Sequence, residues 1–458
     1  MSFMCKYLLI FILLGSVGEG YGQVRIEVIK LSISEAQSYA LQNNRSVMTA
    51  KIDIGIATKL VKENIAIGLP QLNLATNYQH QFVIPELSFG SYLDVDALPD
   101  YGYLTKNDIQ DAYKQAPSVP LGVKDNTTFD FTVSQLIFSG EYLVGLQAFK
   151  VLKQVSEKAL VKTEDQTKET VANTYFMILV LGESLKVLNE SEASMGQTYN
   201  DLVKMNQQGF NEETDVDQIK ISWSNLKRLI TSIESQRDIS VQLLKYQLGM
   251  DFGQQIVLTD SLQGFITEGN MQYLDAQVYN VEKSIDYQIV NNQVDISQLL
   301  LKREQSKYLP AISAFYRRHE QTNQPSFNFA VKDLVGLSLN FPIFTSGQRS
   351  YRVSQARYNL EKSQINKANA EQGLIMEFET ALSNYQTAYS NFLTNKESII
   401  LTKKVYDKSL IKYHEGVSTS FELSQNQTQY LTAEGVYYNS ILSLLNAKAK
   451  LDRILSSY

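Results

Sequence analysis

Cysteine, histidine, proline and tryptophan are all scarce in this chain of 458 residues, which has one, three, eight and one of them respectively. The only cysteine, Cys5, precedes the apolar core of a predicted signal peptide, so the mature chain would have no disulfide, thiolate metal site or thiol nucleophile. A lipoprotein acceptor cysteine would follow that core, so lipidation is excluded too. The scarcity of proline favours long helices.

The first 22 residues predict a secretory signal peptide. Lys6 supplies the positive charge, Tyr7–Leu14 form a short apolar core, and residues 20–22 (GYG) form a small-x-small cleavage site. No later stretch combines the apolarity and the length of roughly 20 residues that a membrane-spanning helix needs. If this exported chain spans a membrane, it must therefore use strands. The net charge of −6 argues against nucleic-acid binding.

Catalytic and metal-binding motifs are missing as well. His80, His319 and His414 are scattered, and no H-E-x-x-H motif, nucleophile elbow, P-loop or dinucleotide fingerprint is found. We therefore predict no enzyme activity, no cofactor and no metal site. The first two histidines are expected to be polar residues of strands or loops, and His414 to flank a turn.

What the sequence does contain is an internal duplication. The Ser-Gly pairs that end at Gly140 and Gly347 lie 207 residues apart, and so do the turn glycines Gly209 and Gly416. Such self-similarity at a fixed offset predicts a repeated structural unit. The predicted domains are residues 1–22 (signal peptide), 23–249 (first repeat), 250–272 (connector) and 273–458 (second repeat).

Each repeat is predicted to begin with a helix that stops before a proline. The first helix would be capped by Ser34 and end before Pro70, and the second would run from Tyr273 and end before Pro310. The first repeat has 33 more residues than the second between its proline and its Ser-Gly pair. They predict a long loop at about 82–120, in the first hairpin.

After each proline the hydrophobic period changes to two. The alternating segments are LNLATNY (72–78), FDFTVS (129–134), ISAFY (312–316) and VGLSLNFP (335–342). They predict four strands in two hairpins, either in a soluble sheet with one wet face or in an outer-membrane β-barrel. Export and the lack of membrane helices favour the barrel. Because the smallest barrels have about eight strands, several chains would have to share one.

After each Ser-Gly pair, helical periodicity continues for about 65 residues, on the order of 100 Å of helix. Shorter return helices of about 35–40 residues would follow Gly209 and Gly416. In the second repeat an apolar residue recurs every seven positions, at Phe378, Tyr385, Phe392, Ile399, Tyr406 and Tyr413. The first repeat keeps part of this stripe, at Val171, Ile178 and Leu185. A heptad stripe predicts coiled-coil packing.

This order of elements resembles the TolC-type outer-membrane efflux proteins. The residues that carry the resemblance are Leu69-Pro70, Leu309-Pro310, Phe138–Gly140, Phe344–Gly347, Gly209 with Asp215, and Tyr413 with Gly416 and Glu422-Leu423. The resemblance implies an α+β membrane protein and a homotrimer. Each chain would give four strands to a shared trimeric β-barrel of twelve strands, continued by a long α-helical coiled-coil barrel that crosses the periplasm.

The resemblance also implies a function in the cell outer membrane. The trimer would be the passive exit duct of a tripartite efflux or type I secretion system. An inner-membrane pump would supply the energy, and a periplasmic adaptor (membrane fusion) protein would dock at the Gly209 and Gly416 turns. The sequence does not identify the cargo. The alternative is an exported periplasmic coiled-coil scaffold without a pore, which would explain the heptads but not the four alternating strands.

Finally, the resemblance implies a gate at the periplasmic tip. In the family a polar lock joins the positions of Asp215, Tyr413 and Ser418, and the family has arginine where this chain has Ser418. An acidic ring falls at Glu422 and Gln425, where one carboxylate per chain would favour cations. The alternative interpretation of Glu422 is a helix N-terminal residue stabilised by the helix dipole.

Overall fold

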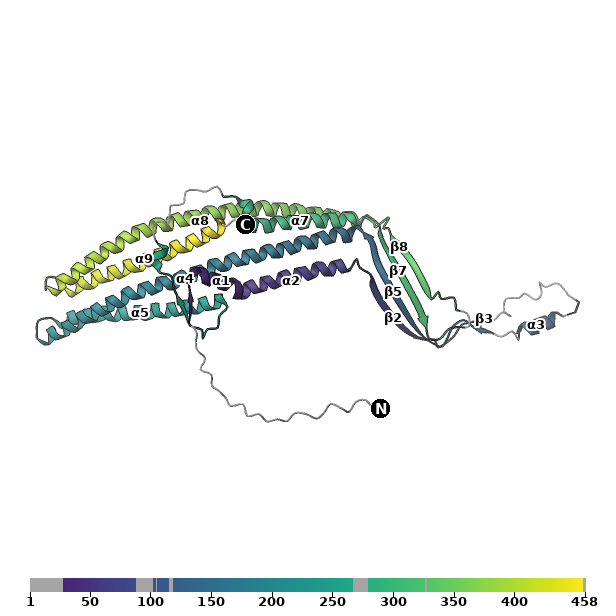
Figure 1. The fold of residues 1–458 in the computed structure, drawn as a ribbon, viewed down its shortest axis with the longest axis horizontal. Helices are drawn as coiled ribbons and strands as arrows, with labels where there is room; N and C mark the ends of the chain where they lie inside the picture. Colours follow the sequence, from purple (N-terminus) through teal and green to yellow (C-terminus); the bar gives the residue numbers. More distant parts are fainter. Residues whose placement is uncertain are drawn as a thin grey trace, which may run out of the picture.

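The computed structural model describes residues 28–87, 102–103, 105–114, 118–266, 279–325 and 328–455. The molecule is long and narrow, with helical hairpins at one end and a β-sheet at the other (Figure 1). The predicted signal peptide, part of the long loop of the first hairpin and the end of the connector lie outside the described residues.

The main sheet contains the four predicted strands. They are β2 (Gln71–His80), β5 (Asp125–Ser139), β7 (Ala311–Gln321) and β8 (Asp333–Asn340), in the order β2-β5-β7-β8 with antiparallel pairing throughout. The pairing of β5 with β7 joins the hairpin of the first half to that of the second. Two further pairs are small: β1 (Ile29–Leu31) with β6 (Ile256–Leu258), and β3 (Glu86–Leu87) with β4 (Val119–Pro120).

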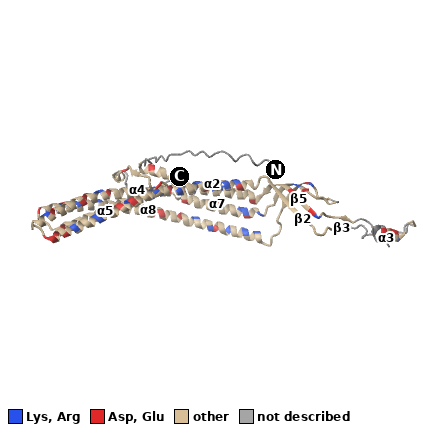
Figure 2. Ribbon diagram, turned by 90° about the horizontal axis from the view of Figure 1, so that it is seen from below, with Lys and Arg blue, Asp and Glu red and all other residues tan. Residues whose placement is uncertain are grey.

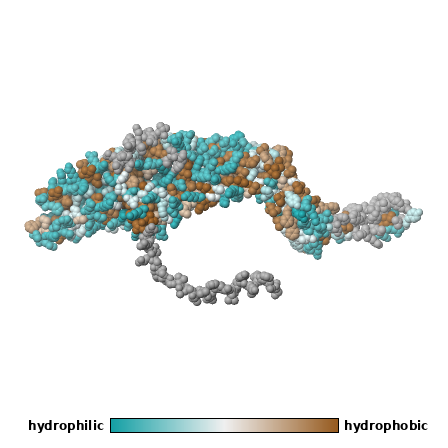
Figure 3. Space-filling view, viewed as in Figure 1, coloured by the Kyte–Doolittle hydropathy of each residue, from teal (hydrophilic) through white to brown (hydrophobic). Residues whose placement is uncertain are grey.

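The strand register separates an apolar face from a polar one. Leu74 lies opposite Phe131, and Ala314 lies opposite Leu337. The same face carries Leu72, Val133, Ile312, Val335 and Leu339, whereas Asn73, Thr132, Ser134, Ser313 and Ser338 lie on the other. The apolar side chains are uncovered: Val335 and Leu337 are each 77% exposed. None of the helices that the structure describes lies over a face of the sheet, and apolar side chains run along it (Figures 1 and 3).

The lengths predicted for the two long helices and for the two return helices are confirmed. Helix α4 (Gly140–Gln207) has 68 residues and α8 (Gln348–His414) has 67, while the return helices α5 (Glu213–Leu248) and α9 (Ser420–Leu455) have 36 each. Each long helix pairs with its return helix, which forms two helical hairpins side by side.

The predicted heptad stripe of α8 is the packing seam of its hairpin. Phe378, Tyr385, Phe392 and Tyr406 are buried, and Ile399 and Tyr413 are half-buried. The rings of Tyr406 and Tyr430 stack with centroids 5.5 Å apart across α8 and α9. The partial stripe of α4, at Val171, Ile178 and Leu185, is buried as well.

The helices next to the sheet differ from the prediction. The first is broken into α1 (Ile33–Asn43) and α2 (Arg45–Ala66), because the Asn44 side chain accepts hydrogen bonds from the backbone amides of Ser46 and Val47 and caps a new helix. Its N-cap is Ser32, in a capping box with Glu35, and not Ser34. Helix α7 (Ile285–Ser306) begins twelve residues after Tyr273, behind a short 3-10 turn (η3, Val281–Lys283). The short helices α3 (Lys106–Lys114) and α6 (Leu262–Phe265) complete the fold.

One expectation about apolar stretches was wrong. An 18-residue window within α4 is long and apolar enough to cross a membrane. However, 56% of that window is buried inside the chain. A helix that packs against neighbours on several sides is apolar around most of its circumference, so burial explains the composition of α4.

The two predicted strand-to-helix turns use glycine for different reasons. Gly347 caps α8 with φ +81°, in the left-handed region that favours glycine. Gly140 is the first residue of α4, and a Cβ there would lie 2.9 Å from Leu309 Cδ1 and 3.2 Å from the Ser306 carbonyl oxygen. The second turn therefore needs a special backbone conformation, and the first needs close packing against the end of α7.

Candidate gating site at the helical tip

The two helical hairpins end in neighbouring turns at the end of the molecule farthest from the sheet (Figure 1). Gly209 (φ +76°) follows α4 and Gly416 (φ +74°) follows α8. A Cβ at either position would meet no atom of the residues that the structure describes within 4 Å. The turns are therefore open surface. Acidic residues Glu213 and Asp215 begin α5 beside the first turn (Figure 2).

An apolar cluster holds the two hairpins together just behind these turns. Its buried members are Met195, Leu202, Ile219, Tyr406, Leu423 and Tyr430. Tyr413, half-buried near the end of α8, packs against the cluster. The tip is thus one packed unit built from α4, α5, α8 and α9.

Polar contacts then join α5 directly to α9. The Ser420 hydroxyl donates a hydrogen bond to the carboxylate of Asp215, and the hydroxyls of Ser222 and Ser424 lie 3.1 Å apart. Asp215 and Tyr413 are also close: burial and then the negative charge of Asp215 raise the pKa of Tyr413 to about 12. Of the predicted lock, the structure brings Asp215 and Tyr413 into one neighbourhood and adds Ser420.

Ser418 and Glu422 form a separate contact at the start of α9. The Ser418 hydroxyl donates to Glu422 Oε2 at 2.9 Å, and the Glu422 backbone amide donates to Thr419 Oγ1 at 3.2 Å. Glu422 is exposed in the first turn of the helix, where the helix dipole favours a negative charge. Ser418 therefore lies beside the predicted acidic position and outside the Asp215 contact.

Gln425 lies farther along α9, in an open groove between α5, α8 and α9. The groove is lined mainly by hydroxyl and amide side chains: Gln218, Ser222, Asn225, Asn395, Ser398, Thr402, Ser424, Gln425, Thr428, Gln429 and Thr432. Ile221, Phe421, Ala433 and Val436 complete the lining. None of these described lining residues carries a charge. Uncharged hydrogen-bonding groups suit a water-filled passage.

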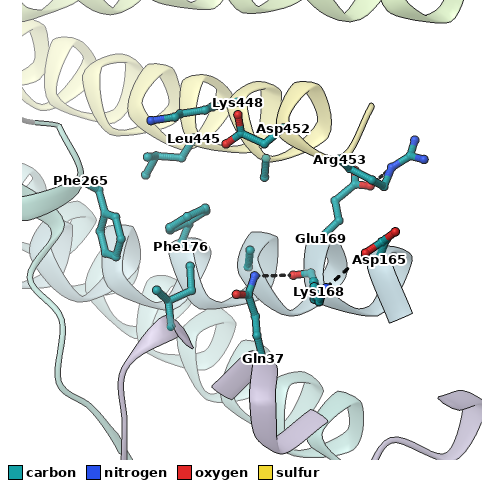
Figure 4. Close-up of a pocket in the computed structure, with 13 residues that line it drawn as sticks. Gln37, Asp165, Lys168, Glu169, Phe176, Phe265, Leu445, Lys448, Asp452 and Arg453 are labelled. Atoms are coloured by element: carbon teal, nitrogen blue, oxygen red, sulfur yellow. Dashed lines mark hydrogen bonds and ion pairs between the residues drawn. The ribbon is translucent and has the colours of Figure 1, made fainter. Parts of the chain in front are cut away.

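A second cavity, of about 480 Å³, lies midway along the molecule between α1, α4, α6 and α9 (Figure 4). Phe176 and Phe265 meet edge to face at its apolar floor, with ring centroids 5.2 Å apart. On its rim, Arg453 pairs with Glu169 at 2.6 Å and with Glu377 of α8 at 3.0 Å. These ion pairs connect the end of α9 to both long helices, α4 and α8. The cavity therefore lies at a contact that stabilises the fold.

Sequence comparisons agree with this architecture. The family model "Outer membrane efflux protein" matches residues 293–457. Outer membrane protein TolC of Escherichia coli (strain K12) is 20% identical to this chain over 441 residues, which cover 92% of this chain and 82% of TolC.

Structure comparisons extend the likeness to nearly the whole chain. CusC superposes with a TM-score of 0.73 at 14% identity and covers 95% of this chain and 94% of its own. The Campylobacter jejuni CmeC outer membrane channel superposes with a TM-score of 0.72 at 15% identity, with coverage of 92% and 85%. These comparisons confirm the resemblance to TolC-type outer membrane efflux proteins.

Proposed function

We propose that this chain, a relative of the TolC-type outer membrane efflux proteins, forms a trimeric outer-membrane channel that extends into the periplasm. The channel would be the passive exit duct of a tripartite efflux or type I secretion system, gated at its helical tip. It would work without a cofactor and without catalysis. Its partners would be two further copies of the chain, outer-membrane lipid, a periplasmic adaptor and, through the adaptor, an inner-membrane pump.

The observation that carries this proposal is an open sheet continued by an open layer of helices. The sheet runs β2-β5-β7-β8, and the helices next to it pack in the matching order α2-α4-α7-α8. Within the described residues, the outer edges of β2 and β8 have no strand partner. Unpaired edges and an exposed apolar face are tolerated only if something covers them. Copies joined edge to edge around one axis would close both layers at once.

Three copies supply twelve strands, above the minimum of about eight for a closed barrel. The apolar face would then meet lipid, and the face with Asn73, Thr132 and Ser338 would line the lumen. At the end of the sheet away from the helices, Tyr78 donates to Asp125 at 2.8 Å and Tyr316 donates to Asp333 at 2.6 Å. Tyrosines that pair with polar groups suit the lipid–water boundary of a barrel. A periplasmic scaffold does not account for this sheet.

The duplication supports the proposed division into a first repeat (23–249) and a second repeat (273–458). In both halves a long helix of nearly equal length is followed by a return helix of 36 residues. The open turns at Gly209 and Gly416 are the proposed docking points for the adaptor, because they lie at the end of the helical hairpins (Figure 1) and leave open space around each glycine.

The gate would be held by the α5–α9 contact of Asp215, together with Tyr413. The double variant Asp215→Ala, Tyr413→Phe should raise the closed-state conductance of the purified protein in planar lipid bilayers by about tenfold, since a hydrogen bond to a charged group contributes about 1.5–3 kcal/mol. Thr214→Ala, an exposed neighbour of Asp215, should leave the conductance unchanged. Equal conductance of the double variant and the unmodified protein would remove the gating role of these residues.

A further inference from the structure

Glu434, in the middle of α9, has an unusual environment. The residue is 1% exposed, and neither carboxylate oxygen has a hydrogen-bond partner among the described residues. Gln427, two helical turns earlier, is 2% exposed, and its side-chain nitrogen likewise has no partner in the described part of the chain. Burying an ionised carboxylate without a hydrogen-bond partner costs free energy. The observed packing of α9 therefore favours the protonated form of Glu434.

No cation of the described residues pairs with Glu434. Glu434 acts electrostatically on two tyrosines of α9, Tyr430 and Tyr438. The other titratable groups around these two rings are Glu183 and Glu190 on α4, Lys403, Tyr406 and Asp407 on α8, and Tyr437 on α9. Lys403 is the one cation among them, and it pairs with Asp407 at 3.3 Å. On the side of α5, the residues that share a groove with Glu434 are Ser222, Asn225, Leu226, Leu229 and Ile233, none of which titrates.

We propose that Glu434 is a proton-binding site that keeps α9 packed against α4 and α5 while it is protonated and loosens this packing when it loses its proton. The groove beside it, of about 520 Å³, is open to solvent and is lined by Glu434 together with Ser184 and Leu188 of α4. This groove is a route by which an ionised carboxylate could reach water. Reaching it requires α9 to rotate or to separate from α4 and α5.

The direction of the pH effect follows from burial, which raises the pKa of Glu434 from 4.5 to about 8. Below the ordinary value both the packed and the loosened states hold the proton, so pH has no effect on their ratio. Between the two values only the loosened state ionises. The population of the packed state relative to the loosened state therefore falls by up to tenfold per pH unit. Above about 8 both states are ionised and the ratio levels off.

Under the proposed function, on which this consequence rests, the proton would act on the gate. Helix α9 begins at the tip with Ser420, which holds Asp215. Loosening of α9 would therefore weaken the α5–α9 contact, and the channel would conduct more at pH 8 than at pH 6.

Hydrogen exchange of the purified full-length assembly tests the proton site without any assumption about transport. After correction for the intrinsic pH dependence of exchange, protection of the amides of residues 427–440 should fall at least tenfold between pH 6 and pH 8. In Glu434→Gln, and in Glu434→Leu should the first variant not assemble, protection should not change with pH. Glu190→Gln, an exposed carboxylate near the same contact, should behave like the unmodified protein.

Two results would overturn the inference: protection in the unmodified protein that does not depend on pH, or the same pH dependence in the Glu434 variants. Conductance measured on the same samples separates the inference from the proposed function. If exchange depends on Glu434 but no current flows at any pH, the channel function fails and the proton site stands.

Discussion

Leu337→Arg is expected to abolish assembly in the outer membrane. Leu337 lies on the apolar face of β8 and is 77% exposed in the single chain, where the proposed barrel meets lipid. An arginine at the lipid face costs about 2–4 kcal/mol at the bilayer midplane, and a trimer would contain three of them. That total is comparable with the whole stability of an ordinary domain, about 5–15 kcal/mol. The measurement is the amount of heat-dissociable oligomer in outer-membrane fractions, by gel electrophoresis without boiling.

The adjacent position gives the matched control. Ser338→Arg introduces the same side chain on the opposite face of the same strand, toward the proposed water-filled lumen. It should assemble at near-normal levels and change only the ion selectivity of the pore. If both variants assembled equally well, or if Ser338→Arg were the more damaging, the assignment of the lipid face would be wrong.

Gly249→Ala is expected to destabilise the chain by on the order of 3 kcal/mol or more. Gly249 ends α5 with φ +73°, a left-handed conformation that costs a residue with a Cβ about 1–2 kcal/mol. The Cβ would also lie 2.9 Å from the carbonyl carbon of Asn43 and closer still to its oxygen. Both are backbone atoms at the end of α1, so the neighbour cannot simply rotate away. We expect a fall of several degrees in the melting temperature of the purified oligomer.

Gly253→Ala, four residues later, is the control for this effect. A Cβ there would meet only Asp251 Oδ1, at 3.4 Å, and the backbone is outside the left-handed region. Its melting temperature should stay within about a degree of that of the unmodified protein, as for an ordinary surface substitution. A fall in Gly249→Ala no larger than in the control would show that the junction of α1 and α5 adapts to the added atom.

Much of the fold could be predicted because its signals are local. The length of a helix follows from its periodicity and from the glycine that ends it, and the faces of the strands follow from alternation. The break at Asn44 was missed because an asparagine within a helical pattern is weak evidence for a new cap. The correct N-cap could have been found, since Ser32 and Glu35 have the spacing of a capping box. The predominantly apolar stretch of α4 depends on tertiary burial, which no local pattern defines.

The candidate site was less predictable because its contacts join distant segments. Ser420 and Asp215 are 205 residues apart in the chain, and nothing in the sequence around either residue indicates their hydrogen bond. Glu434 looks like one more charged residue of a solvated helix until packing shows it enclosed by α4, α5 and α9. The resemblance pointed to the tip and to Asp215 and Tyr413, but the partner of Asp215 within the chain came from the structure.

The central claim is that one chain has too few strands to close its sheet into a barrel, so that several copies form one barrel together. Native mass spectrometry of the protein extracted from outer membranes in mild detergent tests it most directly. The account predicts a single species of three copies that loses its solubility when the detergent is removed. A single-copy species that stays soluble and folded in detergent-free buffer would contradict it.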